Sequence, residues 1–273
     1  MKTDPSDSQS IAITRPRDGI VLLKLNRAPR MNAFTVGMMQ EMHNAIDTIA
    51  VDRSLRALVI AGEGPAFCSG LDLKALPPAL LGTSASVVAW TEIQQLFSGM
   101  SRKLRALDQV VIAAVQGAAV GAGFAMALAA DIRVAARSAA FHIGAVKIGL
   151  SAGECGISYH LPKIVGSARA FELMLTGRPL LADEAERIGL VASVVEEAAL
   201  VESALELATQ VLRNSPYSTR HTKQLMWANL EAPSLEAALQ LEDRTQVMAL
   251  QTADFREAVA AFTEKRPPHF NGT

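Results

Sequence analysis

Two stretches decide the fold and locate a candidate site: Ala66-Phe67-Cys68-Ser69-Gly70-Leu71-Asp72-Leu73-Lys74 and Gln116-Gly117-Ala118-Ala119-Val120-Gly121-Ala122-Gly123. Each follows an apolar run that predicts a buried strand, at 55–61 and at 110–115. Loops at the ends of neighbouring parallel strands can direct two backbone N–H groups at one point. Such a pair suits a carbonyl oxygen that becomes an anion during a reaction. The two loops therefore predict a site that stabilises an oxyanion.

The composition is that of a globular protein with a large aliphatic core. Of 273 residues, 50% are hydrophobic and 5% are aromatic, so alanine, valine and leucine must fill the core. The length suits one or two domains. A formal net charge of -1 gives no electrostatic reason to expect nucleic acid or an anionic membrane as a partner. The two cysteines, Cys68 and Cys155, are too few for a disulfide framework.

The sequence also gives expectations about location. The N-terminus is polar and lacks the apolar run of a signal peptide. The longest apolar stretch, 110–130, is interrupted by three glycines and a glutamine, so it does not predict a membrane span. We therefore expect a soluble, cytoplasmic protein.

Strands and helices alternate along the first two thirds of the chain, which is typical of α/β folds. Strands are expected at 11–14, 20–25, 55–61, 110–115, 132–135 and 139–143, and helices at 35–51, 87–107 and 124–130. From about residue 182 helices dominate, at 183–188, 198–213, 216–229, 234–250 and 253–265. We divide the chain into a disordered N-terminus at 1–10, a core at 11–200 and a C-terminal helical region at 201–273.

An ordered series of motifs, spanning about 11–270, resembles the enoyl-CoA hydratase/isomerase (crotonase) superfamily. The motifs are LNRAPRMNAF at 25–34, AFCSGLDL at 66–73, VIAAVQG at 111–117, AADIR at 129–133, LMLTGR at 173–178 and AERIGLV at 185–191. The resemblance implies a spiral of ββα units with a C-terminal helical trimerisation region. It also implies an acyl-CoA substrate and a homotrimer or a dimer of trimers. Coenzyme A is then part of the substrate, and neither a separate cofactor nor a metal is expected.

The resemblance also assigns residues to the site. The oxyanion-hole amides are those of Leu71 and Ala122, and His142 is expected in the wall of the acyl pocket. Lys265 either contacts the CoA nucleotide or is a solvated terminal charge. The further residues expected to contact the substrate are Ala66, Ser69, Gly70, Asp72, Leu73, Gly121 and Phe262.

The chain departs from the family at the catalytic acids. Hydratases of this family carry two glutamates at the positions that hold Ala125 and Ala145 here. Alanine cannot transfer a proton. The best local substitute is Glu154, which precedes an expected helix at 157–165. Glu154 either acts as acid and base or only caps that helix; helix amides would lower its pKa and an apolar pocket would raise it.

Three functions follow as hypotheses. The first is an enoyl-CoA hydratase, which is our leading prediction, or an enoyl-CoA isomerase, and in either case Glu154 moves the proton. The resemblance implies hydration, whereas a single carboxylate makes double-bond isomerisation chemically easier. The second is a CoA-thioester-binding protein with little catalysis, which would explain both alanines. The third is a serine hydrolase, because 149–153 fits G-x-S-x-G with Ser151 as nucleophile and Asp183 and His221 as possible partners.

Overall fold

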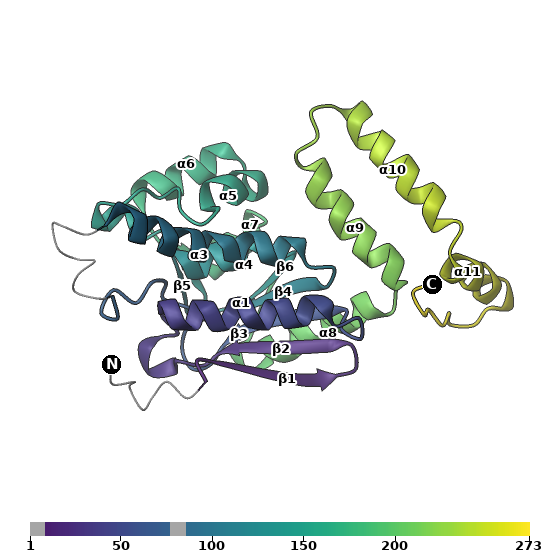
Figure 1. The fold of residues 1–273 in the computed structure, drawn as a ribbon, viewed down its shortest axis with the longest axis horizontal. Coiled ribbons are helices and arrows are strands. Elements are labelled where there is room, and N and C mark those ends of the chain that lie inside the picture. The colour runs from purple at the N-terminus through teal and green to yellow at the C-terminus, as the bar shows by residue number, and fades with distance from the viewer. Residues whose placement is uncertain (1–8, 77–85) are drawn as a thin grey trace.

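The computed structural model describes residues 9–76 and 86–273. Within these residues six strands form the main sheet, in the order β1-β2-β3-β4-β6-β9 (Figure 1). β1 and β2 form an antiparallel hairpin, and the other neighbours are parallel. The predicted hairpin and the α/β class are confirmed. The strands are β1 (Ile11–Arg17), β2 (Ile20–Leu25), β3 (Ala57–Gly62), β4 (Val110–Val115), β6 (Ile132–Ala136) and β9 (Ser193–Val195).

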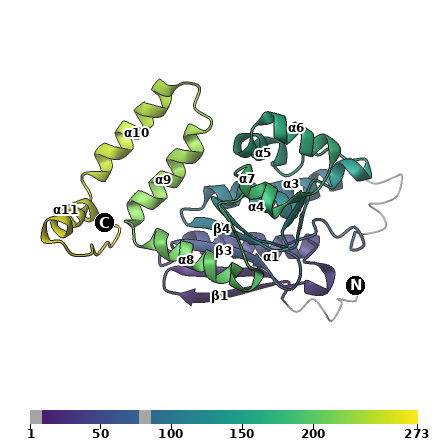
Figure 2. The same ribbon diagram turned by 180° about the vertical axis from the view of Figure 1, so that it is seen from behind.

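Both faces of the central strands β2, β3 and β4 are buried, because successive side chains of these apolar strands point to opposite sides of the sheet. Leu58 and Ile60 pack toward α1 (Val36–Val51), α3 (Val87–Ala106) and α4 (Ala122–Ala129). On the other face, a second layer of apolar side chains packs against α8 (Leu200–Leu212), which Figure 2 shows lying across the sheet. The core therefore extends through α8, past the boundary drawn at residue 200, since the sheet needs that helix to cover it.

A smaller sheet and several short helices stand at the carboxyl ends of the main strands. The small sheet pairs its strands in the order β5-β7-β8 within the described residues. β5 falls inside the second glycine loop, where no strand was predicted. The elements of this layer are β5 (Ala118–Val120), β7 (Ala140–His142), β8 (Leu180–Leu181), α5 (Ile157–Val165), α6 (Ser167–Thr176), α7 (Ala182–Arg187) and the 3-10 helices η2 (Ala28–Arg30), η3 (Ala145–Ile148) and η4 (Glu197–Ala199).

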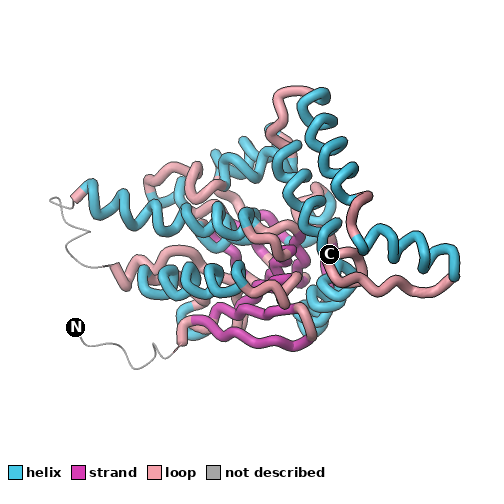
Figure 3. Tube along the Cα trace, turned by 45° about the vertical axis from the view of Figure 1, so that its right-hand side comes forward, coloured by secondary structure: helices cyan, strands magenta, loops and turns pink. Residues whose placement is uncertain are grey.

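Three helices form an arm that projects from the core: α9 (Pro216–Asn229), α10 (Leu235–Ala249) and α11 (Ala253–Glu264). Figures 1 and 3 show α10 running antiparallel to α9, with α11 at the right-hand end of the molecule. α10 has no buried residue, and Leu235 and Met248 are 74% and 61% exposed. The expected helical C-terminal region is therefore present, with an apolar surface that the single chain leaves uncovered.

Helix starts follow local sequence signals. Several long helices begin after a serine or threonine whose side-chain oxygen accepts a hydrogen bond from a backbone N–H of the first turn. This capping satisfies donors that have no partner inside the helix. The capping residues are Thr35 for α1, Ser86 for α3, Ser215 for α9, Ser234 for α10 and Thr252 for α11.

The beginning of the chain bears on two expectations. Residues 1–8, most of the N-terminus expected to be disordered, lie outside the described residues. Ser10 is buried, and its carbonyl accepts a hydrogen bond from the N–H of Asn26 (2.8 Å). Ordered contacts therefore begin before residue 11. None of the helices in 9–76 and 86–273 combines the length and apolar character needed to cross a membrane.

Candidate active site

The two glycine loops lie side by side because backbone hydrogen bonds join them. The N–H of Cys68 donates to the carbonyl of Ala118 (3.0 Å), and the N–H of Val120 donates to the carbonyl of Cys68 (2.8 Å). On its other side the first loop is held by Phe34, whose N–H donates to the carbonyl of Gly70 (2.7 Å). These bonds continue the sheet pattern into the loops and fix one loop relative to the other.

Two glycines permit this close approach. A Cβ at Gly70 would lie 2.9 Å from the carbonyl oxygen of Val120, and the φ of +87° disfavours any other residue there. The same hypothetical atom would lie 3.9 Å from the amide nitrogen of Ala122. A Cβ at Gly123 would lie 2.6 Å from Cβ of Cys68. Side chains at either glycine would force the loops apart.

The backbone amides of Leu71 and Ala122 are available as donors. Ala122 is the first residue of α4, where N–H groups have no partner inside the helix. Within the described chain, neither amide donates a hydrogen bond to another residue. Both residues line one cavity. The structure thus brings together the two predicted donors at the edge of a common space.

That cavity has a volume of about 250 Å³ and lies between the glycine loops, α3 and the segment that precedes α5. Its wall is mostly apolar, and among the described residues that line it Glu154 is the single carboxylate. The described residues that line it are Ser69, Leu71, Leu73, Trp90, Ile93, Gln94, Phe97, Val120, Gly121, Ala122, Gly144, Ala145, Ile148, Leu150, Glu154 and Cys155. Such an apolar space with few polar groups is typical of small-molecule sites.

Glu154 lies against the second glycine loop. A Cβ at Gly121 would stand 3.1 Å from Oε1 of Glu154. Burial raises the pKa of Glu154, because a carboxylate is less well solvated beside apolar walls than in water. α5 begins after Gly156 with no side-chain capping bond. The structure places the carboxylate of Glu154 beside Gly121 in the lining of the cavity, and its role as acid and base stays a prediction.

The two alanines at the family's glutamate positions are placed differently. Ala145 opens η3 and lines the cavity. Ala125 is 1% exposed inside α4 and packs in the main core. Neither carries a group that transfers protons, so Glu154 has no partner acid from these two positions.

Some residues expected to contact substrate support the loops instead. Asp72 is buried and forms an ion pair with Arg27 (3.3 Å), which holds the first loop against η2. The carbonyl of buried Ala66 accepts a hydrogen bond from Nδ2 of Asn32 (2.8 Å). In the described chain the side chains of Ala66 and Asp72 do not line the cavity. Ser69, Leu73 and Gly121 do line it, and their contact with the substrate stays a prediction.

His142 lies outside the cavity lining in the part of the chain described. Its carbonyl accepts a hydrogen bond from the N–H of Gly121 (3.1 Å), and so helps to fix the second loop. Burial, with a smaller effect of Lys147, lowers the pKa of His142. The structure therefore does not place the side chain of His142 in the wall of this cavity. It is the backbone of β7 at His142 that contacts the second glycine loop.

Phe262 and Lys265 lie far from the cavity within one chain. Phe262 is 87% exposed on α11, and Lys265 ends that helix in a left-handed conformation. Figure 1 shows α11 at the right-hand end of the molecule, whereas β5 of the second glycine loop lies toward the left. A single copy therefore does not bring these two residues to its own cavity.

The serine hydrolase arrangement is not formed. Residues 149–153 follow the 3-10 helix η3, whereas a nucleophile elbow follows a strand. Oγ of Ser151 accepts a hydrogen bond from the N–H of Gly153 (3.1 Å). His221 lies on α9 beside the ring of Tyr217, with centroids 4.1 Å apart. These positions overturn the hydrolase hypothesis.

One wall of the cavity is formed by α3, whose residues were not individually assigned to the site from the sequence. Trp90, Ile93, Gln94 and Phe97 of α3 all line it. Their spacing of three and four residues places them on one face of a helix. That spacing was the signal, but it does not distinguish a helix face that lines a cavity from one buried in a core.

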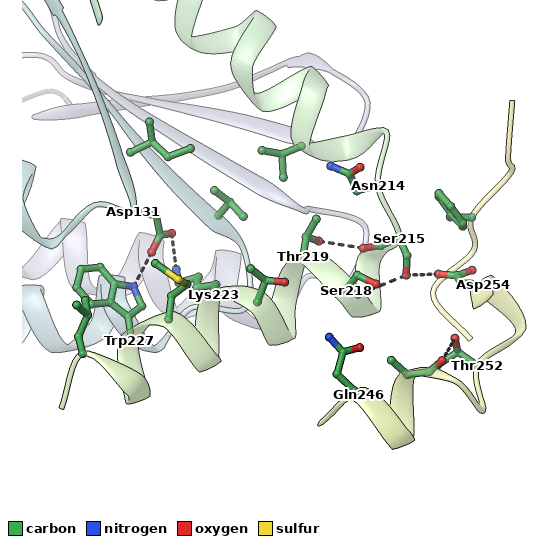
Figure 4. A pocket seen from close by; sticks show the side chains of 18 of the residues that line it. Asp131, Asn214, Ser215, Ser218, Thr219, Lys223, Trp227, Gln246, Thr252 and Asp254 are labelled. Carbon is green, nitrogen blue, oxygen red and sulfur yellow. Dashed lines mark hydrogen bonds and ion pairs between the residues drawn. The ribbon is translucent and has the colours of Figure 1, made fainter. Parts of the chain in front are cut away.

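A larger cavity, of about 830 Å³, opens between the arm and the core (Figure 4). Its polar groups are largely paired with one another. Asp131 forms an ion pair with Lys223 (2.9 Å) and accepts a hydrogen bond from Nε1 of Trp227 (2.7 Å). Ser215 donates to Asp254 (2.6 Å). The two contacts of Asp131 join the arm to the core, and the bond between Ser215 and Asp254 joins the start of α9 to α11.

The chain is similar to known proteins in both sequence and structure. The enoyl-CoA hydratase/isomerase family model matches residues 15–273. A protein of Mycobacterium leprae named probable enoyl-CoA hydratase is 41% identical over 260 residues, covering 94% of this chain and 88% of that protein. A 1,2-epoxyphenylacetyl-CoA isomerase of Escherichia coli is 34% identical over 254 residues, covering 93% and 95%. The crystal structure of an enoyl-CoA hydratase from Bacillus anthracis has a TM-score of 0.91 at 31% identity, covering 97% of this chain and 100% of that one.

Proposed function

The chain belongs to the enoyl-CoA hydratase/isomerase family, and from this premise we propose that it shifts the double bond of an enoyl-CoA thioester with Glu154 as the acid and base. It is an enzyme of that family with the crotonase fold. The observation that carries the proposal is the single carboxylate among the described residues that line the cavity. A one-carboxylate site suits a reaction that takes a proton from one carbon and returns it to another.

The amides of Leu71 and Ala122 take the role of oxyanion hole in this proposal. When Cα of the acyl group loses a proton, negative charge moves to the thioester oxygen. Two fixed N–H donors in a mostly apolar cavity stabilise that charge without reorganising. Losing one such donor typically costs about 100- to 1,000-fold in rate. The support is their shared cavity and the absence of competing acceptors among the described residues.

Glu154 would perform both proton transfers. Its carboxylate removes a proton from Cα of a 3-enoyl thioester, the electron pair moves into the enolate, and the double bond shifts toward Cα. The carboxylic acid then returns the proton to Cγ, giving the 2-enoyl thioester and the original carboxylate. The raised pKa of Glu154 brings its two protonation states closer in free energy at neutral pH, which suits a group that must both accept and donate.

Hydration is the second candidate, favoured by the names of several relatives. It requires Glu154 to activate water at Cβ and also to deliver a proton to Cα. Because Ala125 and Ala145 replace the two acids, neither position supplies a second carboxylate that could share these two steps with Glu154. The isomerase name of the Escherichia coli relative supports the first candidate. A protein that binds CoA thioesters without turnover is the third.

The CoA portion and the assembly belong to the same proposal. CoA enters as part of the substrate, and no separate cofactor is assigned. Phe262 and Lys265 would contact the nucleotide of CoA bound to another copy, because α11 lies far from its own cavity. The exposed apolar side chains of α10, including Leu235 and Met248, would be covered by association into a trimer or a dimer of trimers.

A matched pair of six-carbon substrates tests the proposal. Purified protein is assayed for isomerisation of 3-hexenoyl-CoA and for hydration of 2-hexenoyl-CoA, and binding of saturated hexanoyl-CoA is measured by calorimetry. The expected result is a kcat/KM for isomerisation that exceeds that for hydration. Faster hydration would favour the second candidate. Binding without turnover of either substrate would favour the third.

A further inference from the structure

Ser101 of α3 makes a buried contact with the segment that carries the candidate base. Its Oγ donates a hydrogen bond to the carbonyl of Cys155 (2.7 Å), and the residue is 7% exposed. Ser101 lies one turn beyond Phe97, so the contact continues the helix face that lines the cavity. α3 therefore forms one wall of the cavity and also holds the adjacent turn at Cys155 by a hydrogen bond.

The turn at Cys155 and Gly156 has an unfavourable backbone conformation. Cys155 has a φ of +48° and Gly156 a φ of +95°. A left-handed conformation is disfavoured for a residue with a Cβ, so it persists only where neighbours hold it. Two backbone bonds bracket the turn: Ile157 N–H donates to the carbonyl of Glu154 (2.8 Å), and His160 N–H to that of Gly156 (2.9 Å). The carbonyl of Cys155 between them is held by Ser101.

We propose that Ser101 is a positioning residue, which orients the carboxylate of Glu154 toward Gly121 and Ala122 by fixing the peptide plane between Cys155 and Gly156. This inference rests on the proposed function, because it assigns Ser101 no role apart from Glu154. Rotation of that peptide plane would change the direction of the backbone at Cys155 and so move the side chain of Glu154 before it. A group that acts as acid and base must stay within hydrogen-bond reach of the carbon it serves. Ser101 itself does not touch the substrate.

The test compares Ser101→Ala with Ser98→Ala. Alanine favours the helix, so Ser101→Ala removes the buried hydrogen bond without opposing α3. Ser98 is on the same helix, with its hydroxyl directed to the carbonyl of Gln95 (3.4 Å), and serves as the matched control. For isomerisation of 3-hexenoyl-CoA we expect Ser101→Ala to lower kcat by at least about tenfold, since small misplacements of catalytic groups are costly. KM should change by less than about twofold, and Ser98→Ala should match the wild type.

Two further readouts separate positioning from a general structural role. In Ser101→Ala the pH midpoint of kcat/KM should move toward that of a solvated carboxyl, because a displaced Glu154 meets more water. In a Glu154→Gln background Ser101→Ala should have no additional effect on kcat. An unchanged kcat in Ser101→Ala, or an equal loss in both backgrounds, would overturn the inference. If Ser101→Ala does not fold, Ser101→Cys, with a weaker donor of similar size, is judged by the same criteria.

The inference and the function that it rests on fail differently. If Glu154→Gln alone leaves isomerisation intact, the assignment of Glu154 is wrong and the inference falls with it. If Glu154→Gln abolishes isomerisation and Ser101→Ala does not reduce kcat, only the positioning role is wrong. The same set of variants therefore distinguishes the two results.

Discussion

Glu154 lies in the space that the missing side chain of Gly121 leaves open: a Cβ at Gly121 would stand 3.1 Å from Oε1 of the glutamate. Gly121 has a φ of +51°, precedes Ala122 and serves as the N-terminal boundary of α4. One glycine thus allows the turn that frees the amide of Ala122 and leaves room for a carboxylate beside it. The candidate base and one oxyanion donor are held together by this residue.

Replacing Gly121 by alanine should therefore damage activity beyond its effect on stability. The unfavourable φ alone costs on the order of 1–3 kcal/mol. The added methyl group also displaces the carboxylate of Glu154, so we expect kcat for isomerisation to fall at least about tenfold. Steady-state kinetics and urea unfolding measure the two effects.

Gly189→Ala is the matched control for that change. Gly189 has a comparable φ of +77°, and a Cβ there would meet no atom within 4 Å. It should share the stability loss and keep kcat near the wild-type value. Equal loss of kcat in both variants would mean that backbone strain, and not the contact with Glu154, limits the reaction.

The pH dependence of kcat/KM should show one limb on the acid side. Burial raises the pKa of Glu154 above its ordinary value of 4.5. The carboxylate form must accept the first proton, so activity should be lost as the pH falls through this raised pKa. A profile from about pH 4 to pH 9 measures the limb. An acid limb at or below the ordinary carboxyl value would contradict the burial of the acting group.

Glu154→Gln should raise thermal stability at neutral pH. Folding raises the pKa of the Glu154 carboxyl, so the folded state binds its proton more tightly than the unfolded state does. The protonated carboxyl therefore stabilises the fold fully at a pH below the pKa of the unfolded state. This stabilisation is lost as the pH rises through the pKa of the folded state. Glutamine removes that loss, and the difference in Tm from the wild type should vanish in acid. Exposed Glu92→Gln on α3 should show no such gain. A lower Tm for Glu154→Gln at neutral pH would contradict the account.

The ion pair between Lys223 and Asp131 should carry much of the attachment of the arm to the core. Their side chains are 4% and 13% exposed, so Lys223→Met leaves a buried carboxylate without its counter-charge. Breaking a buried pair in this way costs about 3–5 kcal/mol. Arg137→Met, which breaks an exposed pair with Glu196, should cost about 0–1 kcal/mol. Urea unfolding measures both, and equal losses would refute the buried role of Lys223.

The fold was predictable where side-chain periodicity matched burial. The central strands and α1 follow apolar patterns that the packing confirms. α6 was not predicted, because Phe171 and Leu175 are 65% and 72% exposed, so the apolar residues of this helix do not form a single buried face. β5 was hidden because glycines that favour a loop surround three residues that pair with Cys68 and β7. Pairing between distant segments, and not local propensity, makes that strand.

The site was predictable to the extent that backbone amides define it. The glycine loops indicated a pair of backbone donors, the family resemblance identified them as Leu71 and Ala122, and the structure places both at one cavity. The orientation of His142 was not predictable, since it depends on the register of β7 against β5. Ser101 gave no signal in the sequence, because its partner is a carbonyl 54 residues away.

The most direct test of the central claim is the rate of 3-hexenoyl-CoA isomerisation by Glu154→Gln, with Glu92→Gln as control. General acid–base catalysis contributes about 100- to 10,000-fold, so we expect a loss of that size in kcat for Glu154→Gln and wild-type kcat for Glu92→Gln. Binding of hexanoyl-CoA should be retained by both variants. A Glu154→Gln enzyme that isomerises the substrate at the wild-type rate would contradict the assignment of Glu154 as the acid and base.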